Sequence, residues 1–271
     1  MANYKVGCKK LKNRNKPSKI KYQSSSWSFK KNISLSQYAE PYAGGASVAL
    51  KLLLNNEVKE IHINDFDKCI YNFWHSILNN TEEFIAKINN TPVNITEWQQ
   101  QKEILKTTND TLLSGFATFY LNRTNFSGVI KGGPIGGIKQ NSKYKIDCRF
   151  NKINLIKKIE TIAKLKNKIK LYNLDAIEFI EKIDKKRNIL IYIDPPYYNK
   201  GKELYMNFYN DNNHTELEQT IKKIKNKWLL SYDKCPFIEN LYKDFIINTK
   251  ELCYSAGYKK VAKELLISKA G

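Results

Sequence analysis

The chain has 271 residues, 42% of them hydrophobic, a composition that supports a sizeable core and excludes a disordered polypeptide. It carries 46 lysines and arginines against 26 acidic residues, and this net charge of +20 is typical of a protein that binds a polyanion such as nucleic acid. No apolar run is long enough for a membrane helix, and the first residues lack the apolar region of a secretory signal, so we predict a cytoplasmic protein with no membrane partner. The five cysteines are scattered and form no C-x-x-C pair, so we predict no metal partner.

The positive charge is concentrated in two segments. Residues 5–31 hold ten basic residues, and no acid occurs before Glu40. No acid occurs between Asp110 and Asp147 either, whereas one arginine and four lysines do. A gene rich in A and T would raise the number of lysines throughout the chain, but it would not empty two segments of acids. The distribution therefore favours a nucleic-acid partner.

The beginning of the chain predicts a strand–turn–helix unit and a second strand. Residues 10–31 are polar and basic, as in a loop or arm. Residues 36–40 predict a short strand, which a glycine turn joins to a helix at residues 48–54. Residues 60–65 alternate between apolar and polar types, as a strand does, and residues 68–78 predict a helix.

The middle of the chain differs in character from both ends. Residues 80–120 have the apolar spacing of helices, whereas residues 122–149 contain five of the 12 glycines and indicate a β-hairpin or a long basic loop. A basic helix is predicted at residues 152–168. Further strands are predicted at residues 169–172, 189–193, 228–231 and 245–247, with helices between them at residues 175–182 and 215–225. Alternating strands and helices at both ends predict an α/β sheet with an insertion.

A candidate catalytic site follows the apolar run at residues 188–193. This run ends at Asp194, Pro195, Pro196 and Tyr197, and ligands of open α/β sheets bind beyond the carboxyl ends of the strands. Because the prolines lack N–H groups, Asp194 and the carbonyl oxygen of Pro195 can form a rigid pocket of hydrogen-bond acceptors. An exocyclic amino group could donate two hydrogen bonds to this pocket, which would also stabilise positive charge as the nitrogen receives a methyl group. Tyr197 could stack on the base, which would first have to rotate out of a duplex. The alternative interpretation is a structural turn.

Two further segments could bind a ligand. Residues 40–47, with the sequence E-P-Y-A-G-G-A-S, would let the backbone approach a ligand at the beginning of a helix, or would only form a tight turn. They do not match G-x-G-x-x-G, which disfavours a dinucleotide. Asp65, at the end of a predicted strand, could accept hydrogen bonds from ribose hydroxyls or cap the next helix.

Together these segments resemble the Dam-like (D12) class of adenine-N6 DNA methyltransferases over nearly the whole chain. Residues 40–47 are similar to the family's methionine-binding loop, although Gly44 and Gly45 are adjacent here. Residues 194–197 are its D-P-P-Y segment. Residues 5–9 are similar to a segment where the family places a lysine, and residues 65–67 to the segment that holds the cofactor ribose. Residues 120–128 resemble the start of its DNA-reading hairpin. Two more similar segments lie near the C-terminus, at residues 230–233 and 259–266.

The resemblance implies a Rossmann-like α/β methyltransferase sheet formed by residues 1–70 and 166–271, with a helical and β-hairpin target-recognition domain inserted at residues 71–165. It implies transfer of a methyl group from S-adenosyl-L-methionine to N6 of a flipped-out adenine in double-stranded DNA. The implied catalytic residues are Asp194, Pro195, Pro196 and Tyr197. The implied cofactor-binding residues are Lys9, Glu40, Pro41, Tyr42, Ala43, Gly44, Gly45, Ser47, Asp65, Phe66, Asp175 and Asp194. The implied DNA-binding residues are Asn122, Arg123, Phe126, Ser127, Lys131 and Lys139. Among these, Phe126 could act as a wedge or only pack, and Arg123 could instead form a structural ion pair.

Several alternatives stay open. The acceptor could be N4 of cytosine, an adenine of ribosomal RNA or a protein glutamine, although an aspartate at position 194 is typical of adenine enzymes. The chain could also be a DNA-binding protein that has the fold but no activity. A bacterial or phage origin, a separate restriction endonuclease as partner, the oligomeric state and the recognition sequence are not decided by these residues.

Overall fold

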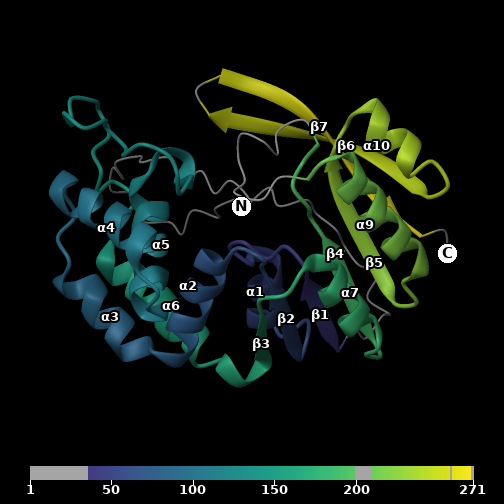
Figure 1. Ribbon diagram of the computed structural model, residues 1–271, viewed down its shortest axis with the longest axis horizontal. Helices are drawn as coiled ribbons and strands as arrows, with labels where there is room; N and C mark the ends of the chain where they lie inside the picture. The colour runs from purple at the N-terminus through teal and green to yellow at the C-terminus, as the bar shows by residue number, and fades with distance from the viewer. Residues whose placement is uncertain (1–35, 199–208, 257, 270–271) are drawn as a thin grey trace, which may run out of the picture.

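The computed structural model describes residues 36–198, 209–256 and 258–269 (Figure 1), so the predicted arm at residues 10–31 and Lys9 lie outside the described residues. The described residues form a sheet of seven strands in the order β3-β2-β1-β4-β5-β7-β6. The strands are β1 (Gln37–Glu40), β2 (Glu60–Asn64), β3 (Ile169–Tyr172), β4 (Ile189–Ile193), β5 (Lys227–Asp233), β6 (Ile246–Ala256) and β7 (Tyr258–Ser268).

Strands β3, β2, β1, β4 and β5 are parallel to one another, and β7 is antiparallel to both β5 and β6. The strand order reverses between β1 and β4, because β2 continues from β1 on one side and β5 from β4 on the other. Ligands of doubly wound sheets bind at such a switch point, beyond the carboxyl ends of the strands. This topology confirms the predicted Rossmann-like α/β sheet.

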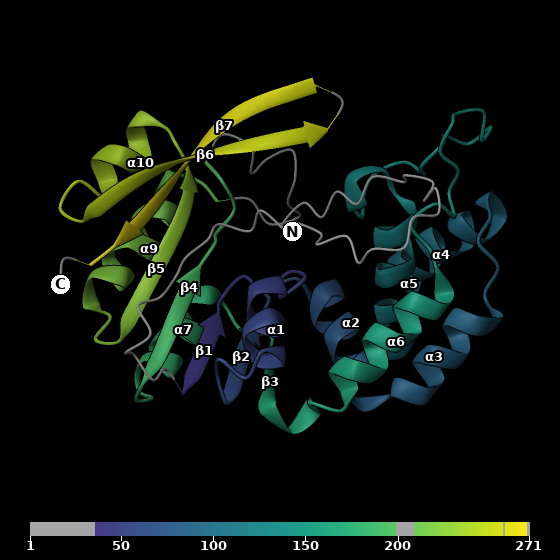
Figure 2. The same ribbon diagram turned by 180° about the vertical axis from the view of Figure 1, so that it is seen from behind.

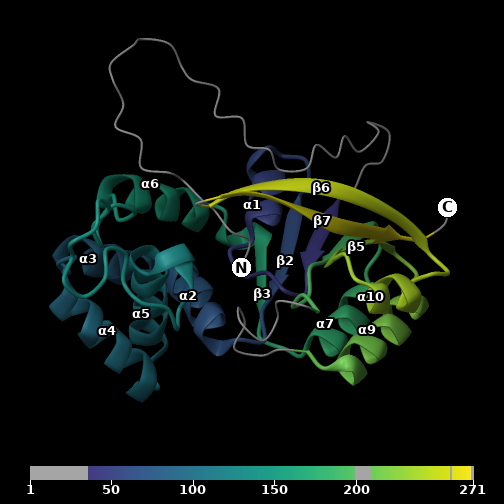
Figure 3. The same cartoon turned by 90° about the horizontal axis from the view of Figure 1, so that it is seen from above.

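Strand β4 shows why the sheet carries helices on both faces. Successive side chains of a strand point to opposite faces, and Leu190 packs in one hydrophobic cluster while Ile189, Ile191 and Ile193 pack in another. The first cluster continues into α1 (Ser47–Leu54) and α2 (Lys68–Asn79). The second continues into α7 (Ala176–Asp184), α9 (Asp211–Lys223) and α10 (Pro236–Leu241), which share one face of the sheet in Figure 3.

Five helices between β2 and β3 form a helical body beside the sheet (Figures 1 and 2), as residues 80–120 and 152–168 predict. They are α2, α3 (Thr81–Asn90), α4 (Ile95–Thr107), α5 (Thr111–Thr124) and α6 (Lys152–Ala163). Side chains of Asp67, Asn94, Asp110 and Asn151 cap α2, α4, α5 and α6 by accepting hydrogen bonds from first-turn N–H groups. Helices α2 and α5 approach closely at Gly115, where an added Cβ would lie 2.5 Å from a carbonyl oxygen of α2.

The glycine-rich segment between α5 and α6 is a long loop. Its described residues contain a single turn of 3-10 helix at Phe126–Gly128 and one isolated bridge between Asn125 and Pro134. Of the two sequence-based alternatives, the loop is therefore observed and a hairpin of paired strands is not. The buried side chain of Asn125 shapes the loop, because it accepts a hydrogen bond from the Trp98 indole (2.6 Å) and donates to the carbonyl oxygens of Val129 and Ile130.

The C-terminal hairpin is longer than the sequence predicts. Residues 245–247 are predicted as a strand, whereas β6 has eleven residues and pairs with β7 along its whole length. Strand β7 contacts β5 only through residues 264–268. The far part of the hairpin therefore extends beyond the sheet (Figure 1).

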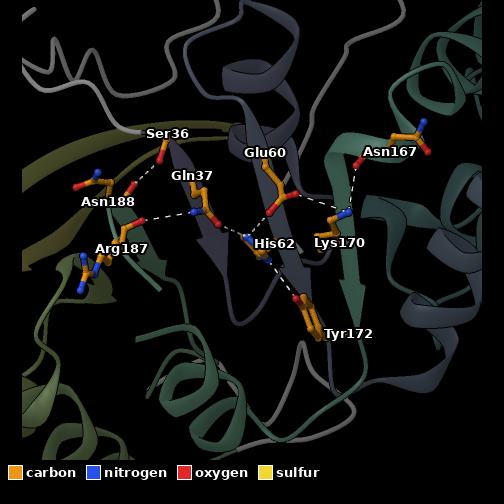
Figure 4. Close-up of polar contacts among 9 residues, drawn as sticks. All are labelled: Ser36, Gln37, Glu60, His62, Asn167, Lys170, Tyr172, Arg187 and Asn188. Atoms are coloured by element: carbon orange, nitrogen blue, oxygen red, sulfur yellow. Dashed lines mark hydrogen bonds and ion pairs between the residues drawn. The ribbon is translucent and has the colours of Figure 1, made fainter. Parts of the chain in front are cut away.

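A polar cluster lies near the amino ends of β1 and β2 (Figure 4). His62 Nε2 donates to Gln37 Oε1 (2.9 Å) and to Glu60 Oε1 (3.0 Å), and its Nδ1 accepts from the Tyr172 hydroxyl (3.2 Å). Burial is the main cause that lowers the pKa of His62 to about 4, so the ring is neutral. Lys170 lies 3.6 Å from the other oxygen of Glu60. These contacts satisfy the cluster, in which Gln37, Glu60 and Lys170 lie toward the amino ends of their strands, away from the predicted site, whereas Tyr172 is the last residue of β3.

Candidate active site

Four acidic residues mark the carboxyl ends of four neighbouring strands. Glu40 is the last residue of β1, Asp65 follows β2, Asp175 caps the helix after β3, and Asp194 follows β4. Because these strands are parallel and adjacent, the four residues lie at the same edge of the sheet. The structure thus brings together the residues that the sequence predicts for catalysis and cofactor binding, apart from Lys9.

The loop between β1 and α1 is bent by two residues in the left-handed region, Gly44 (φ 48°) and Ala46 (φ 45°). The N–H of Ala43 donates to the carbonyl of Asn64 (2.8 Å), and the N–H of Gly44 donates to Asp65 Oδ2 (2.9 Å). Apart from Gly45 and its two neighbours in the chain, no atom of the described residues lies within 4 Å of the place where a Cβ on Gly45 would stand. The loop is therefore tied to β2 and leaves open space at Gly45, before the helix that begins at Ser47.

Asn64 is a site residue that the sequence analysis missed. It is fully buried at the end of β2, where its Nδ2 donates to the carbonyl oxygens of Pro41 (2.9 Å) and Leu174 (3.1 Å). Its Oδ1 accepts from the N–H of Leu174 (2.9 Å). One side chain thus joins the loops that follow β1 and β3. The signal for it is a polar residue at the end of a strand that is otherwise buried.

Asp65 and Asp67 have different roles. Asp67 caps α2 by accepting from the N–H of Cys69 (2.9 Å), whereas Asp65 accepts from the N–H groups of Gly44 and Asp67. The capping alternative for Asp65 is therefore wrong. Burial is the main cause that raises the pKa of Asp65 to about 6, and its backbone hydrogen bonds oppose this. The next predicted residue, Phe66, is 57% exposed at the same edge.

Glu40 is buried below the glycine loop. Its Oε1 accepts from the Tyr38 hydroxyl and from the N–H of Ala49, both at 3.0 Å. Burial raises the pKa of Glu40 to about 8, although these two hydrogen bonds favour the charged form. Tyr42 points elsewhere, and its hydroxyl lies 2.7 Å from that of Tyr209 before α9.

Asp194 is held by β5. Its Oδ1 accepts from the Ser231 hydroxyl (2.7 Å), whose oxygen lies 3.0 Å from the Tyr192 hydroxyl. Because Ser231 gives its single hydrogen to the carboxylate, Tyr192 donates to Ser231. Burial raises the pKa of Asp194, and hydrogen bonds from Ser231 and Tyr197 oppose the rise.

The rest of the D-P-P-Y segment is fixed by residues near the C-terminus. Pro195 and Pro196 are buried. The Tyr197 hydroxyl donates to Glu264 Oε1 on β7 (2.7 Å). Ser231 and Glu264 lie in the segments 230–233 and 259–266 that resemble the family, but the sequence alone gives neither residue a role, because their partners are distant in the chain.

The acids at this edge fit a cationic ligand. Burial raises the pKa values of Glu40, Asp65 and Asp194. Within the part of the chain that the structure describes, no ion pair joins any of them to a lysine or arginine. A cation bound among them would stabilise their charged forms. S-adenosylmethionine, the cofactor that the resemblance implies, carries a sulfonium and an ammonium group, so these residues fit it.

The predicted DNA-contacting residues lie on the loop after α5 and at the end of that helix. Phe126 is 71% exposed, and Ser127, Lys131 and Lys139 are exposed as well. Arg123 is only half-exposed and donates to Asn122 Oδ1 through Nη2 (2.8 Å), so its interaction here is with an amide and not with an acid. Burial, followed by the charge of Arg149, lowers the pKa of Arg123 to about 10.

The described residues contain no group of three or more His, Cys, Asp or Glu side chains placed to hold a metal ion. None of their helices is both long and apolar enough to cross a bilayer.

A family model and several solved structures match most of the chain. The family model described as D12 class N6 adenine-specific DNA methyltransferase matches residues 21–255. No curated protein matches the chain. Similar solved structures include an uncharacterized protein from Listeria monocytogenes serotype 4b (8% identity, TM-score 0.39) and an rRNA methyltransferase from Streptomyces viridochromogenes (8% identity, TM-score 0.38). The matched part is 88% of this chain in both cases, but 64% of the first structure, less than two thirds of its length, and 78% of the second.

Proposed function

Because the chain belongs to the D12 class of N6 adenine-specific DNA methyltransferases, we propose that it transfers a methyl group from S-adenosylmethionine to N6 of an adenine flipped out of double-stranded DNA. The observation that carries this proposal is the placement of Asp194. This carboxyl lies at the carboxyl end of β4 beside the switch point of the sheet, followed by two buried prolines and Tyr197. Such a site suits a reaction that needs acceptors for an amino group and a flat apolar surface for a base.

Asp194 and the carbonyl oxygen of Pro195 would accept the two hydrogens of the adenine amino group. Accepting both hydrogens localises the lone pair on N6, which forms the new bond to the methyl carbon as the carbon–sulfur bond breaks. S-adenosylmethionine supplies the electrophilic methyl group. The carboxylate of Asp194 would stabilise the positive charge that develops on N6; the sulfur would leave as a neutral thioether, and the methylated nitrogen would pass one proton to solvent. The hydroxyl of Ser231 fixes one carboxylate oxygen before substrate arrives.

The cofactor would lie across the ends of β1, β2 and β3. The glycine loop, including Gly44, would approach its methionine part, and Asp65 would accept hydrogen bonds from ribose hydroxyls with the lone pairs that its backbone contacts leave. Asp175 would lie near the adenine ring. These roles follow from the family resemblance and from the position of the acids at this edge.

The predicted insertion, residues 71–165, contains the helical body except for the first three residues of α2 and would recognise DNA, and residues 1–70 and 166–271 would form the catalytic domain. The loop after α5 exposes Lys131, Lys139 and the Phe126 ring, which suit phosphates, base edges and a stacking contact. If Lys131 reads bases, Lys131→Ala will relax sequence discrimination. If it contacts only phosphate, affinity will fall evenly for all sequences.

The test is methyl transfer to unmethylated genomic DNA, with modified bases identified by single-molecule sequencing. We expect N6-methyladenine within one short sequence. Detection of N4-methylcytosine would mean that the substrate is cytosine and not adenine, while the proposed mechanism of amino-group methylation would stand. A protein that binds DNA but modifies no base, or that binds DNA but not S-adenosylmethionine, would overturn the proposal in favour of an inactive DNA-binding protein.

A variant of Asp194 separates chemistry from binding. Asp194→Ala should abolish methylation because it removes the acceptor for the amino group, and DNA affinity in a filter-binding assay should be preserved. Equal loss of DNA affinity would make Asp194 a structural residue.

A further inference from the structure

Strand β7 brings a second carboxyl group to the D-P-P-Y segment. Glu264 pairs with Asp233 of β5 on one side and with Lys250 of β6 on the other. It is the first residue of β7, in chain order, that pairs with β5, and the part of the C-terminal hairpin before it extends beyond that pairing. The position is half-buried, and it lies 67 residues from Tyr197 in the chain.

The hydroxyl of Tyr197 interacts with two carboxyl groups. It donates to Glu264 Oε1 at 2.7 Å. Burial is the main cause that raises the pKa values of both Asp194 and Glu264; a hydrogen bond from Tyr197 opposes the rise at each carboxyl, and the charge of Asp194 adds to the rise at Glu264. Both carboxyl groups are thus close to the same phenol.

A phenol has one hydrogen to donate. A Tyr197 hydroxyl that gives its hydrogen to Asp194 takes up one lone pair of the carboxylate and draws negative charge away from the oxygen that accepts from the adenine amino group. A hydroxyl that gives its hydrogen to Glu264 leaves this lone pair and this charge to the substrate. The short contact with Glu264 favours the second arrangement.

We propose that Glu264 is a positioning residue that binds the Tyr197 hydroxyl and so keeps the Asp194 carboxylate available to the adenine amino group. The inference rests on the proposed function, since it assigns a role to a residue of the same site. The hydrogen bond between Tyr197 and Glu264 is present in the protein without substrate.

The experiment compares single-turnover methylation rates of wild type, Glu264→Leu, Glu264→Gln, Tyr197→Phe and the double variant Glu264→Leu/Tyr197→Phe. We expect Glu264→Leu to be about ten- to a hundredfold slower, the effect of losing a hydrogen bond to a charged group. Glu264→Gln keeps an acceptor oxygen and should recover most of the rate. The double variant lacks the competing hydroxyl and should be faster than Glu264→Leu. A double variant as slow as Glu264→Leu, or slower, would overturn the proposal.

Glu251→Leu is the matched control. Glu251 is an exposed carboxylate on the same hairpin, and its loss should leave the rate unchanged. Urea denaturation of all variants would identify any that fail to fold.

A second measurement does not depend on activity. Carboxyl 13C NMR of aspartate-labelled protein, with the Asp194 signal assigned from Asp194→Asn, gives the pKa of Asp194 in each variant. In Glu264→Leu the hydroxyl turns to Asp194, so this pKa should be lower than in the double variant, which has lost the same charge but has no hydroxyl. Equal values would refute the competition. A wild type that methylates no adenine would refute the proposed function and leave this comparison decisive.

Discussion

Replacing Asn64 with leucine tests how the cofactor edge of the sheet is held together. Asn64→Leu keeps the approximate volume of the side chain but removes three hydrogen bonds, two to carbonyl oxygens and one from the N–H of Leu174. Each contributes about 0.5–1.5 kcal/mol, so the free energy of unfolding should fall by about 3 kcal/mol. Because the loops that follow β1 and β3 lose their common anchor, S-adenosylmethionine should bind at least about tenfold more weakly, although Asn64 is buried and cannot touch it.

Urea denaturation and isothermal titration calorimetry measure the two effects. With an m-value of about 3 kcal/mol/M, the midpoint should move by about 1 M. Asn79→Ala is the control, because the exposed Asn79 amide makes one hydrogen bond within its own helix and its loss should cost less than about 0.5 kcal/mol. If Asn64→Leu unfolds and binds cofactor as wild type does, the two loops do not depend on this side chain and the reasoning is wrong.

Three further predictions concern helix packing, catalysis and pH. Gly115→Ala should destabilise the protein by about 1–2 kcal/mol in urea, because a Cβ 2.5 Å from the Asn72 carbonyl oxygen forces α2 and α5 apart and helix propensity offsets only part of this; a more stable variant would contradict the close packing. Ser231→Ala should lower kcat about tenfold or more without changing DNA affinity, because it removes the donor to Asp194, and a parallel loss of DNA binding would refute that role. Burial raises the pKa of Asp65 to about 6, so its anionic form is lost below that pH and S-adenosylmethionine should bind more weakly at pH 5 than at pH 7; a cofactor affinity that does not change with pH would count against Asp65 as a ligand. Without cofactor, the raised pKa means that the folded state binds the proton more tightly than the unfolded chain does. The contribution of Asp65 to the free energy of unfolding therefore falls as pH rises from about 4 to about 6.

The sequence predicts those parts of the fold whose pattern is local. The apolar run of β4 is buried on both faces, so its limits agree with the prediction at residues 189–193. Helices of the helical body have side-chain caps and an apolar stripe, both of which are visible in the sequence. The C-terminal hairpin lacks such a pattern, because among the described residues β6 pairs with β7 alone, and much of β7 lies before the residues that pair with β5. Its length could therefore not be predicted.

The same distinction applies to the site. Asp194 and Asp65 could be predicted because each ends a strand, and strand ends meet at one edge of a parallel sheet. Asn64, Ser231 and Glu264 are polar residues within strands, and the residues next to them in the chain do not indicate a binding partner. Their partners come from other strands and loops, so only the tertiary structure shows what they bind.

The position of the helical body between β2 and β3 has a consequence for synthesis on the ribosome. The first strand, β1, pairs with β4, and a hydrogen bond beside this pair joins Ser36 to Asn188, 152 positions later. At about 5–20 residues per second, β1 waits roughly 8–30 s for this partner. The helices of the body contact one another and lie between β2 and β3 in the chain, so they can form during that interval, while the side of β1 that later pairs with β4 stays open. A nascent chain arrested just before β4 would therefore expose the side of β1 that pairs with β4 in the finished protein, which is the switch point where the candidate active site forms.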